Sequence, residues 1–299
     1  MDAFELSARI GDYVARKHPR IRYFTADVEA ARRKYSEEEL AEMEALGLTG
    51  DGFETYYVVR EFLAECGATE LADGGYLLAL FREAKRLDAV EFRENPYIRA
   101  VTVPTVRRGQ ILLTTAEYRR GEILQYAMPD FAARTVVPRL GFFDRTVRFP
   151  TVYEGDTPWM SVCPSEISSM QEPIAAAHGR VLVLGLGLGY YPFMIAEKDD
   201  VEEITVVELQ EDVIALFTEH LLPQFPGREK LRIVQGDAVA FLDGVTDGTY
   251  DFCFADIWEG AVDGAIPYQR IKAHEPRLPS TEFSYWIEPQ IRAYLAEAE

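Results

Sequence analysis

The chain has 299 residues, of which 48% are hydrophobic and 27% charged, enough for two domains and a sizeable core. No stretch approaches about 18 uninterrupted apolar residues and the first residues lack the build of a signal peptide, so we expect a soluble, cytoplasmic protein with no membrane partner. The net charge of −19 falls mainly in residues 151–299, where 9 Lys and Arg oppose 26 Asp and Glu. This charge argues against nucleic acid and would attract a cationic small molecule, although an acidic surface that only confers solubility explains it too.

Residues 1–95 have helical patterns and are expected to form a helical N-terminal region. Ser36, followed three residues later by Glu39, forms a capping box, and Tyr35 with Leu40 can form the hydrophobic staple across it. Gly47 ends the helix that begins there. The patterns predict further helices over Phe4–Ala15, Phe53–Cys66 and Asp73–Glu91.

Residues 96–165 change to a pattern of short strands and are expected to form a small β unit. Ile111–Tyr118 and Glu122–Ala127 are rich in β-forming residues and are joined by Arg119–Gly121, which predicts a hairpin. The change of pattern near residue 165 sets the boundary with a third segment, 166–299. The three cysteines are widely spaced, which favours reduced core residues over a disulfide framework or a zinc site.

The third segment opens with a strand, a glycine turn and a helix. Val181–Leu184 is a short apolar run, and Gly185, Gly187 and Gly189 follow it directly. A second apolar run ends on Glu208, 19 residues after the last glycine. In such a β-turn-α-β unit the glycines let the backbone approach a ligand, and a carboxylate at the tip of the second strand can accept both ribose hydroxyls of an adenosine.

The spacing of the glycines distinguishes two cofactor classes. A dinucleotide fingerprint has the form G-x-G-x-x-G, whereas the sixth position here is Tyr190. The observed G-x-G-x-G spacing suits S-adenosylmethionine better, because this ligand has no phosphate to bind. A nicotinamide dehydrogenase therefore remains only as a distant alternative.

Three more strands and three more helices are expected downstream. The predicted strands are Leu231–Val234, Phe252–Ala255 and Glu282–Ile287, and the predicted helices are Asp212–Leu222, Val262–His274 and Pro289–Ala298. Glu208, Asp237 and Asp256 each follow a strand. Since ligands bind at the carboxyl ends of parallel strands, we expect these three carboxylates to converge.

The segment from about Tyr153 to Gly260 resembles the class I S-adenosylmethionine-dependent methyltransferases, and within them the spermidine synthase-like branch. The similarity rests on Val206–Ile214 (VVELQEDVI), on Gly236–Ala238 (GDA) and on Tyr250–Phe252 leading to Asp256. Ser165-Glu166 is faintly similar to a D-E segment that precedes the sheet in those synthases. The implied fold class is α/β: a Rossmann-like, parallel-sheet methyltransferase domain, truncated after strand 5 and preceded by a helical plus small β region.

The resemblance also implies roles for single residues. It places Glu208 on the ribose hydroxyls and Asp237 with Ala238 on the adenine, and it passes Gly185–Gly189 beneath the amino-acid portion of the cofactor. Leu209 belongs to the same cofactor-binding set. Asp256 matches a carboxylate that helps to deprotonate an attacking amine, and Glu259 falls where the family has a second carboxylate for the amine substrate.

Departures from the synthase pattern favour S-adenosylmethionine over its decarboxylated form. Leu188 replaces the aspartate that helps to hold the aminopropyl amine, and Ser168, Ser169 and Met170 stand where a Tyr-His or Tyr-Gln pair is expected. The shortened tail is a further departure. The chain also lacks an Asn/Asp-Pro-Pro-Tyr segment and a His, Asp and Asn cluster, which argues against methylation of bases or protein amides and against a metal-dependent O-methyltransferase.

The leading hypothesis is methyl transfer to a small, amine-bearing acceptor, with Asp256 as base or orienting carboxylate. Trp258, Tyr190, Tyr191 and Glu259 would line the acceptor pocket, although Trp258 can equally belong to the core and the tyrosines can simply pack the helix start. The alternatives are a spermidine synthase-like aminopropyltransferase and a non-catalytic cofactor- or partner-binding protein on the same fold. The acceptor is not specified by any motif, and a homodimer is the default expectation.

Overall fold

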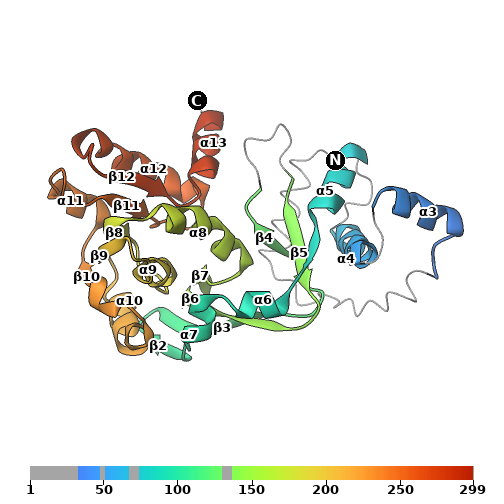
Figure 1. Cartoon of the computed structure of the whole chain (residues 1–299), viewed down its shortest axis with the longest axis horizontal. Helices are drawn as coiled ribbons and strands as arrows, with labels where there is room; N and C mark the ends of the chain where they lie inside the picture. Colours follow the sequence, from blue (N-terminus) through green and yellow to red (C-terminus); the bar gives the residue numbers. More distant parts are fainter. Residues whose placement is uncertain (1–32, 48–50, 67–73, 130–136, 299) are drawn as a thin grey trace. The chain divides into compact units, whose positions relative to one another are not determined.

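A computed structural model describes residues 33–47, 51–66, 74–129 and 137–298 (Figure 1). Contacts between residues divide the chain into two compact units, one within Met1–Phe92 and Glu117–Arg148 and the other within Arg93–Ala116 and Phe149–Glu299. Each unit thus combines two separate segments of chain. The division expected from the sequence at 1–95, 96–165 and 166–299 stays a prediction, and the expected helix Phe4–Ala15 lies outside the described residues.

The first unit combines helices with a three-stranded sheet. Its helices are α3 (Glu37–Ala45), α4 (Asp51–Glu65), α5 (Gly74–Glu83) and α6 (Ala89–Arg93), and its strands are β1 (Lys85–Leu87), β4 (Leu124–Ala127) and β5 (Arg139–Phe143). The capping box is confirmed, because the Glu39 N–H donates to Ser36 Oγ at 3.2 Å and the Ser36 N–H donates to Glu39 Oε2 at 2.7 Å. Buried aromatic and aliphatic side chains, among them Phe53 and Leu80, form the core of this unit.

The helix predicted over Asp73–Glu91 is wrong in its second half. The helical pattern ends at Glu83, and Lys85–Leu87 then pairs in parallel with Gly141–Phe143 of β5. Pairing with a strand more than 50 residues away in sequence overrides the local helical pattern. The predicted helix Phe53–Cys66 is confirmed as α4.

The predicted hairpin is also wrong, although both of its strands exist. β3 (Ile111–Tyr118) pairs with β2 (Val106–Arg108) in a sheet of order β2-β3-β6-β7, whereas β4 pairs with β5. The segment between β3 and β4 turns at Gly121, which has φ +73° and donates its N–H to Phe143 O at 2.9 Å. The runs of β-forming residues identify strands but not their partners, which are set by tertiary packing.

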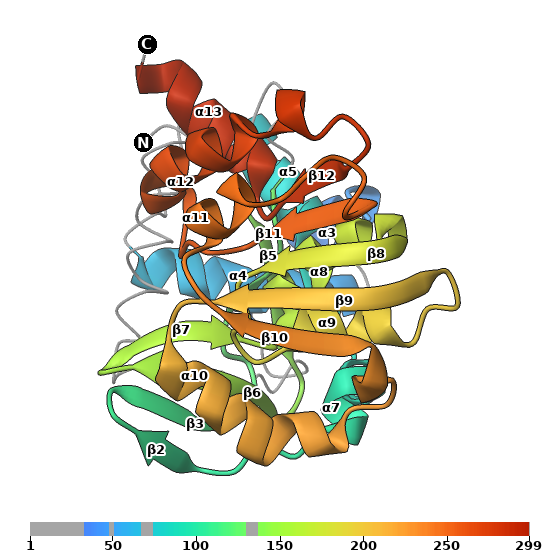
Figure 2. The ribbon, with the colours of Figure 1, turned by 90° about the vertical axis from the view of Figure 1, so that its left-hand side faces the viewer.

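The second unit contains the five-stranded parallel sheet predicted from the sequence (Figure 2). Its strands are β8 (Gly179–Leu184), β9 (Val201–Glu208), β10 (Leu231–Gln235), β11 (Phe252–Ala255) and β12 (Glu282–Tyr285). They lie in the order β10-β9-β8-β11-β12, and every neighbouring pair is parallel. The strand order reverses between β8 and β11, and doubly wound folds bind their ligands at this point. The predicted α/β, Rossmann-like fold class is confirmed.

Helices and a second sheet complete this unit. The helices are α7 (Pro96–Ala100), α8 (Pro164–Ala176), α9 (Tyr190–Ala196), α10 (Glu211–Leu216), α11 (Ala238–Asp243), α12 (Ala261–Lys272) and α13 (Glu288–Ala298). The second sheet includes β6 (Val147–Glu154) and β7 (Thr157–Ser161), paired antiparallel. α10 continues into a π-helical turn, Phe217–Leu221, which explains why the predicted helix Asp212–Leu222 is longer than α10.

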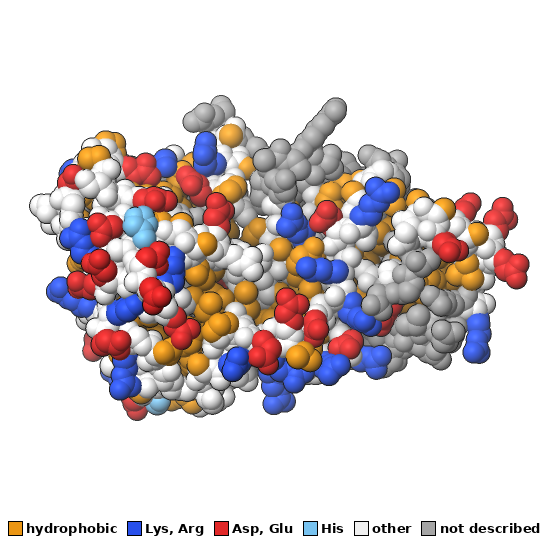
Figure 3. Space-filling model, in the orientation of Figure 1, with side chains coloured by type: hydrophobic (Ala, Val, Ile, Leu, Met, Phe, Trp, Pro, Cys, Tyr) orange, Lys and Arg blue, Asp and Glu red, His pale blue; other side chains and the backbone are white. Residues whose placement is uncertain are grey.

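The face of this unit seen in Figure 3 does not show one acidic patch. Figure 3 shows acidic and basic side chains interspersed over the helices and strands at its left, so the negative charge is spread rather than gathered on the face in view. Such a distribution agrees with a role in solubility. Among the described residues, no helix combines the length and apolar character needed to cross a bilayer.

Candidate functional site

The glycine turn between β8 and α9 passes close to the end of β11. Gly185 has φ +102°, and a Cβ atom at this position would overlap the backbone oxygen of Asp256. A Cβ atom at Gly187 would overlap the sulfur of Met160, which accepts the Leu188 N–H at 3.3 Å. Only glycine combines this backbone conformation with these contacts, so the spacing of the motif follows from close packing.

Residues from α7 hold the turn from behind. The hydroxyl of Tyr97, which is fully buried, donates to the carbonyl oxygen of Leu188 at 2.6 Å. Asn95 Nδ2 donates to the hydroxyl of Tyr190 at 3.0 Å, one residue after the turn. The side chain of Leu188 is itself buried and does not face the cavity described below.

We expect Tyr97→Phe to lower the free energy of unfolding of this unit by about 1–3 kcal/mol, because the buried Leu188 carbonyl loses its donor. Urea unfolding followed by tryptophan fluorescence measures this, since all three tryptophans lie in this unit. Tyr190→Phe is the matched control: it removes a hydroxyl from a half-buried contact and should cost less. Equal losses in the two variants would contradict the anchoring role of Tyr97.

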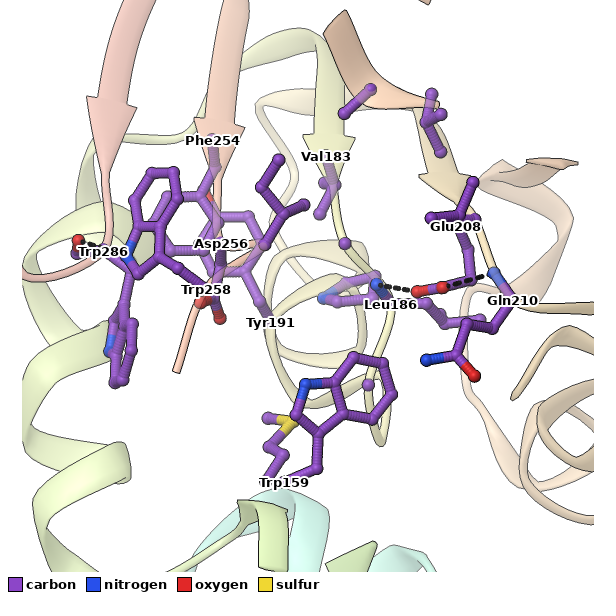
Figure 4. Close-up of a pocket in the computed structure, with 18 of the residues that line it drawn as sticks. Trp159, Val183, Leu186, Tyr191, Glu208, Gln210, Phe254, Asp256, Trp258 and Trp286 are labelled. Carbon is purple, nitrogen blue, oxygen red and sulfur yellow. Dashed lines mark hydrogen bonds between the residues drawn. The ribbon is translucent and has the colours of Figure 1, made fainter. Parts of the chain in front are cut away.

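Glu208 ends β9 beside the turn. Its side chain is only 4% exposed, and its two carboxylate oxygens accept the Leu186 N–H at 3.1 Å and the Gln210 N–H at 2.8 Å. Burial raises the pKa of this carboxyl, and the backbone N–H groups lower it in part. The contacts fix the carboxylate at one end of a cavity, as Figure 4 shows.

The cavity has a volume of about 270 Å³ and lies at the carboxyl ends of β8, β9, β10 and β11. It brings together nine of the residues predicted from the sequence. Six of them were predicted to bind a cofactor: Gly185, Gly187, Glu208, Leu209, Asp237 and Ala238. The other three are Tyr191, Asp256 and Trp258, which lie at the end of the cavity away from Glu208. The predicted convergence of the three strand-end carboxylates is confirmed.

Three predicted site residues lie outside this cavity. Gly189 is the N-cap of α9 and packs against Phe217, and the Tyr190 ring lies against the ring of Tyr97. Glu259 is exposed, and its backbone N–H donates to the carboxylate of Asp263 at 2.8 Å. Their roles in binding stay predictions that this arrangement does not support.

The sequence reasoning missed Glu166, which lies in the first turn of α8 and lines the cavity with Asp256. Burial, together with the neighbouring Asp256 carboxylate, raises the pKa of Glu166 to about 8, and burial raises the pKa of Asp256 to about 7. No Lys, Arg or His is among the described residues that line the cavity. The faint similarity around Ser165-Glu166 was the only signal for this residue.

All three tryptophans of the chain line the same cavity. Trp258 Nε1 donates to Trp286 O at 3.2 Å, and Trp286 Nε1 donates to Ser169 Oγ at 2.9 Å, so the two indoles are held at the Asp256 end. Trp159 comes from β7. Trp258 is 5% exposed and therefore belongs both to the core and to the cavity wall. Trp286 directly follows β12 but lies within the predicted strand Glu282–Ile287, so the strand-end rule that selects Asp256 did not select it.

The described residues contain no group of three or more His, Cys, Asp or Glu placed to hold a metal ion. Besides aliphatic side chains and the amide of Gln210, the described residues at the site supply carboxyls, aromatic rings and thioethers. These can accept hydrogen bonds from hydroxyls, move a proton and pack against a cation.

Searches with models of known protein families and against curated proteins find no match to the chain. Among solved structures, spermidine synthase from Thermotoga maritima is similar at 14% identity and a TM-score of 0.32, over 40% of this chain and 48% of that chain. The methyltransferase domain of bacterial CtHen1-C is 20% identical, with a TM-score of 0.28, over 36% and 56% of the two chains. Precorrin-8W decarboxylase of Methanobacterium thermoautotrophicum is 15% identical, with a TM-score of 0.32, over 43% and 68%.

The matched part of the chain spans about half the length of the first two of these proteins. Similarity at this level says nothing of substrate or activity. The strand order of the parallel sheet nevertheless agrees with the resemblance predicted from the sequence. The chain has an α/β, Rossmann-like fold built on a five-stranded parallel sheet.

Proposed function

We propose that this protein binds S-adenosylmethionine and transfers its methyl group to a small acceptor. The observation that carries the proposal is the position of Glu208, a buried carboxylate at the tip of β9, oriented by two backbone N–H groups and facing a cavity at the switch point of the sheet. Each oxygen has a further lone pair free to accept a ribose hydroxyl.

The rest of the cavity fits the same cofactor. Asp237 caps α11 by accepting the Ala240 N–H at 2.8 Å, which supports the proposal that Asp237 and Ala238 contact the adenine. The described lining residues include several carboxyls and no cationic side chain, which suits a sulfonium and disfavours the pyrophosphate of a dinucleotide. When bound, S-adenosylmethionine supplies an activated methyl group, so the chain's own residues need only align the acceptor and exclude water.

Leu188 favours methyl over aminopropyl transfer, because its buried side chain offers no carboxylate for the amine of a decarboxylated cofactor. One observation favours the second candidate. Among the residues that the structure describes at the cavity, none is a cationic side chain that could pair with the carboxylate of S-adenosylmethionine, and the decarboxylated form does not need one. An aminopropyltransferase therefore stays the alternative proposal.

A calorimetric titration of the purified protein with S-adenosylmethionine, decarboxylated S-adenosylmethionine and NAD tests the proposal. We expect S-adenosylmethionine to bind with micromolar affinity and NAD to give no heat of binding. Tighter binding of the decarboxylated form would transfer the proposal to aminopropyl chemistry. If none of the three binds, the enzyme proposal fails and a partner-binding protein on this fold takes its place.

A further inference from the structure

Strand β7 contains a β-bulge beside the glycine turn. Met160 of β7 pairs with Val152 of β6. Two residues earlier Pro158 pairs with Tyr153, so Trp159 is an extra residue without a partner in the ladder. Neighbouring residues of a regular strand point to opposite faces of the sheet, but Trp159 and Met160 both line the cavity. The bulge therefore brings two consecutive side chains of β7 to the cavity.

Met160 lies directly on the glycine turn. Its sulfur accepts the Leu188 N–H at 3.3 Å and occupies the space that a Cβ atom at Gly187 would need. The carbonyl oxygen of Leu188 accepts the hydroxyl of Tyr97. Both polar groups of Leu188 are thus already bonded within the protein, and its N–H is not free to receive a ligand.

Trp159 is the one tryptophan whose indole N–H has no acceptor among the described residues. The indole N–H of Trp258 donates to Trp286 O, and that of Trp286 donates to Ser169 Oγ. Figure 4 shows the ring of Trp159 beside the glycine turn, with its nitrogen on the side of Tyr191. Since an indole N–H can only donate, its natural partner is an acceptor on a bound ligand.

The covalent structure of the proposed cofactor connects this donor to one chemical group. The adenine and the sulfonium of S-adenosylmethionine are attached at opposite ends of the ribose. With the ribose at Glu208 and the adenine at Asp237, the sulfonium and the amino-acid portion must extend toward Asp256. The glycine turn lies on this path, because it contacts Glu208 on one side and the backbone of Asp256 on the other. The amino-acid portion therefore passes between the turn and Trp159.

We infer that Trp159 binds the carboxylate of the cofactor through its indole N–H and thereby selects S-adenosylmethionine over the decarboxylated form. This inference rests on the proposed function and deepens it. It assigns a binding role to a residue that the sequence pattern did not select, and it explains how a cavity whose described lining residues include no cationic side chain can still bind a carboxylate. A hydrogen bond to a charged group is worth roughly tenfold to 100-fold in affinity.

Two ligands that differ only in the carboxylate test the inference. S-adenosylhomocysteine and its decarboxylated analogue share the adenosine, the thioether and the ammonium group. We expect calorimetric titration at pH 7 to show that wild type binds S-adenosylhomocysteine at least about tenfold more tightly than the analogue. In Trp159→Phe the two affinities should lie within about twofold of each other. The ratio isolates the indole N–H, because the smaller ring affects both ligands alike.

Trp286→Phe is the matched control. It also removes an indole from the cavity wall, but the N–H of this indole is already bonded to Ser169. The preference for S-adenosylhomocysteine should therefore stay within about twofold of that of wild type, even if both ligands bind more weakly. Circular dichroism and thermal unfolding show whether each variant is folded.

The indole N–H can also be observed directly. The three tryptophans give three indole resonances in the NMR spectrum of ¹⁵N-labelled protein, and the resonance missing from Trp159→Phe belongs to Trp159. We expect this resonance to move downfield when S-adenosylhomocysteine binds, because its proton then donates to a carboxylate. It should remain near its unliganded position when the decarboxylated analogue binds.

Three results would overturn the inference: equal affinity of wild type for the two ligands, a preference that survives in Trp159→Phe, or an indole resonance that responds equally to both. Each of them leaves the proposed cofactor site intact and removes only the role of Trp159. Failure of the proposed function is a different result. In that case wild type binds neither ligand, and the inference fails with it.

Discussion

Replacing Glu208 by Gln should weaken the binding of S-adenosylhomocysteine by about 100-fold or more. Hydrogen bonds to a charged group are worth about 1.5–3 kcal/mol each, and this carboxylate is positioned to accept two from the ribose. Glu208 now accepts hydrogen bonds from two backbone N–H groups. The NH₂ group of the new side chain would point at one of these, so that two donors would face each other. Calorimetric titration of wild type and variant measures the loss.

A modified ligand separates this effect from general damage to the site. The 2′-deoxy analogue of S-adenosylhomocysteine lacks one ribose hydroxyl and should bind wild type about tenfold more weakly than the parent compound. In Glu208→Gln the two ligands should bind within about twofold of each other, because the acceptor of that hydroxyl is already missing. Glu202→Gln, an exposed position on the same strand, is the control and should bind like wild type. An undiminished effect of the 2′-hydroxyl in Glu208→Gln would place the ribose elsewhere.

The second large effect concerns stability and its dependence on pH. Folding raises the pKa values of Glu166 and Asp256, so their protonated forms favour the folded state. Their contribution is greatest near pH 4 and is lost as the pH rises through about 7 and 8. Each unit of pKa difference corresponds to about 1.4 kcal/mol, so a shift of about 3 units in each carboxyl sets an upper limit of roughly 9 kcal/mol on the total loss.

Glu166→Gln should therefore stabilise the protein without ligand at pH 8.5 and leave it nearly unchanged at pH 4.5. We expect a melting temperature roughly 5–10 °C above wild type at the higher pH, since about 1 kcal/mol shifts the melting temperature of a domain of this size by roughly 2–4 °C. Thermal unfolding of wild type, Glu166→Gln and the exposed control Glu172→Gln at both pH values measures this. An advantage of the same size at both pH values would mean that the buried charge is not its cause.

The parallel sheet could be predicted from the sequence because each of its strands is a short apolar run bounded by a recognisable turn. The glycine motif and the carboxylates of Glu208, Asp237 and Asp256 occupy fixed places relative to those strands, so their convergence could be predicted. The hairpin after β3 did not follow, since the runs of β-forming residues say nothing of which strand is the neighbour. For the same reason β1 was not predicted: its residues have a helical pattern, but they form a strand that pairs with β5.

The acceptor side was harder to predict for a related reason. Glu166 lies 90 residues before Asp256, on a helix that precedes the sheet, and no local pattern joins the two. Trp159 comes from an antiparallel strand whose position over the glycine turn depends on the fold as a whole. Glu259 was selected by its spacing from Asp256, but the chain turns after Trp258 and leaves that side chain exposed. Spacing along the chain is informative at strand ends and loses its value once the chain enters a loop.

The contact between Tyr97 and Leu188 bears on how this chain can be divided. A fragment beginning at residue 166, where the sequence pattern changes, would contain all five parallel strands but neither Tyr97 nor Trp159. It would lack the hydroxyl that supports the glycine turn and part of the cavity wall. The parallel sheet and the segments 93–116 and 149–165 belong to one compact unit, so a fragment meant to keep the cavity would have to include them.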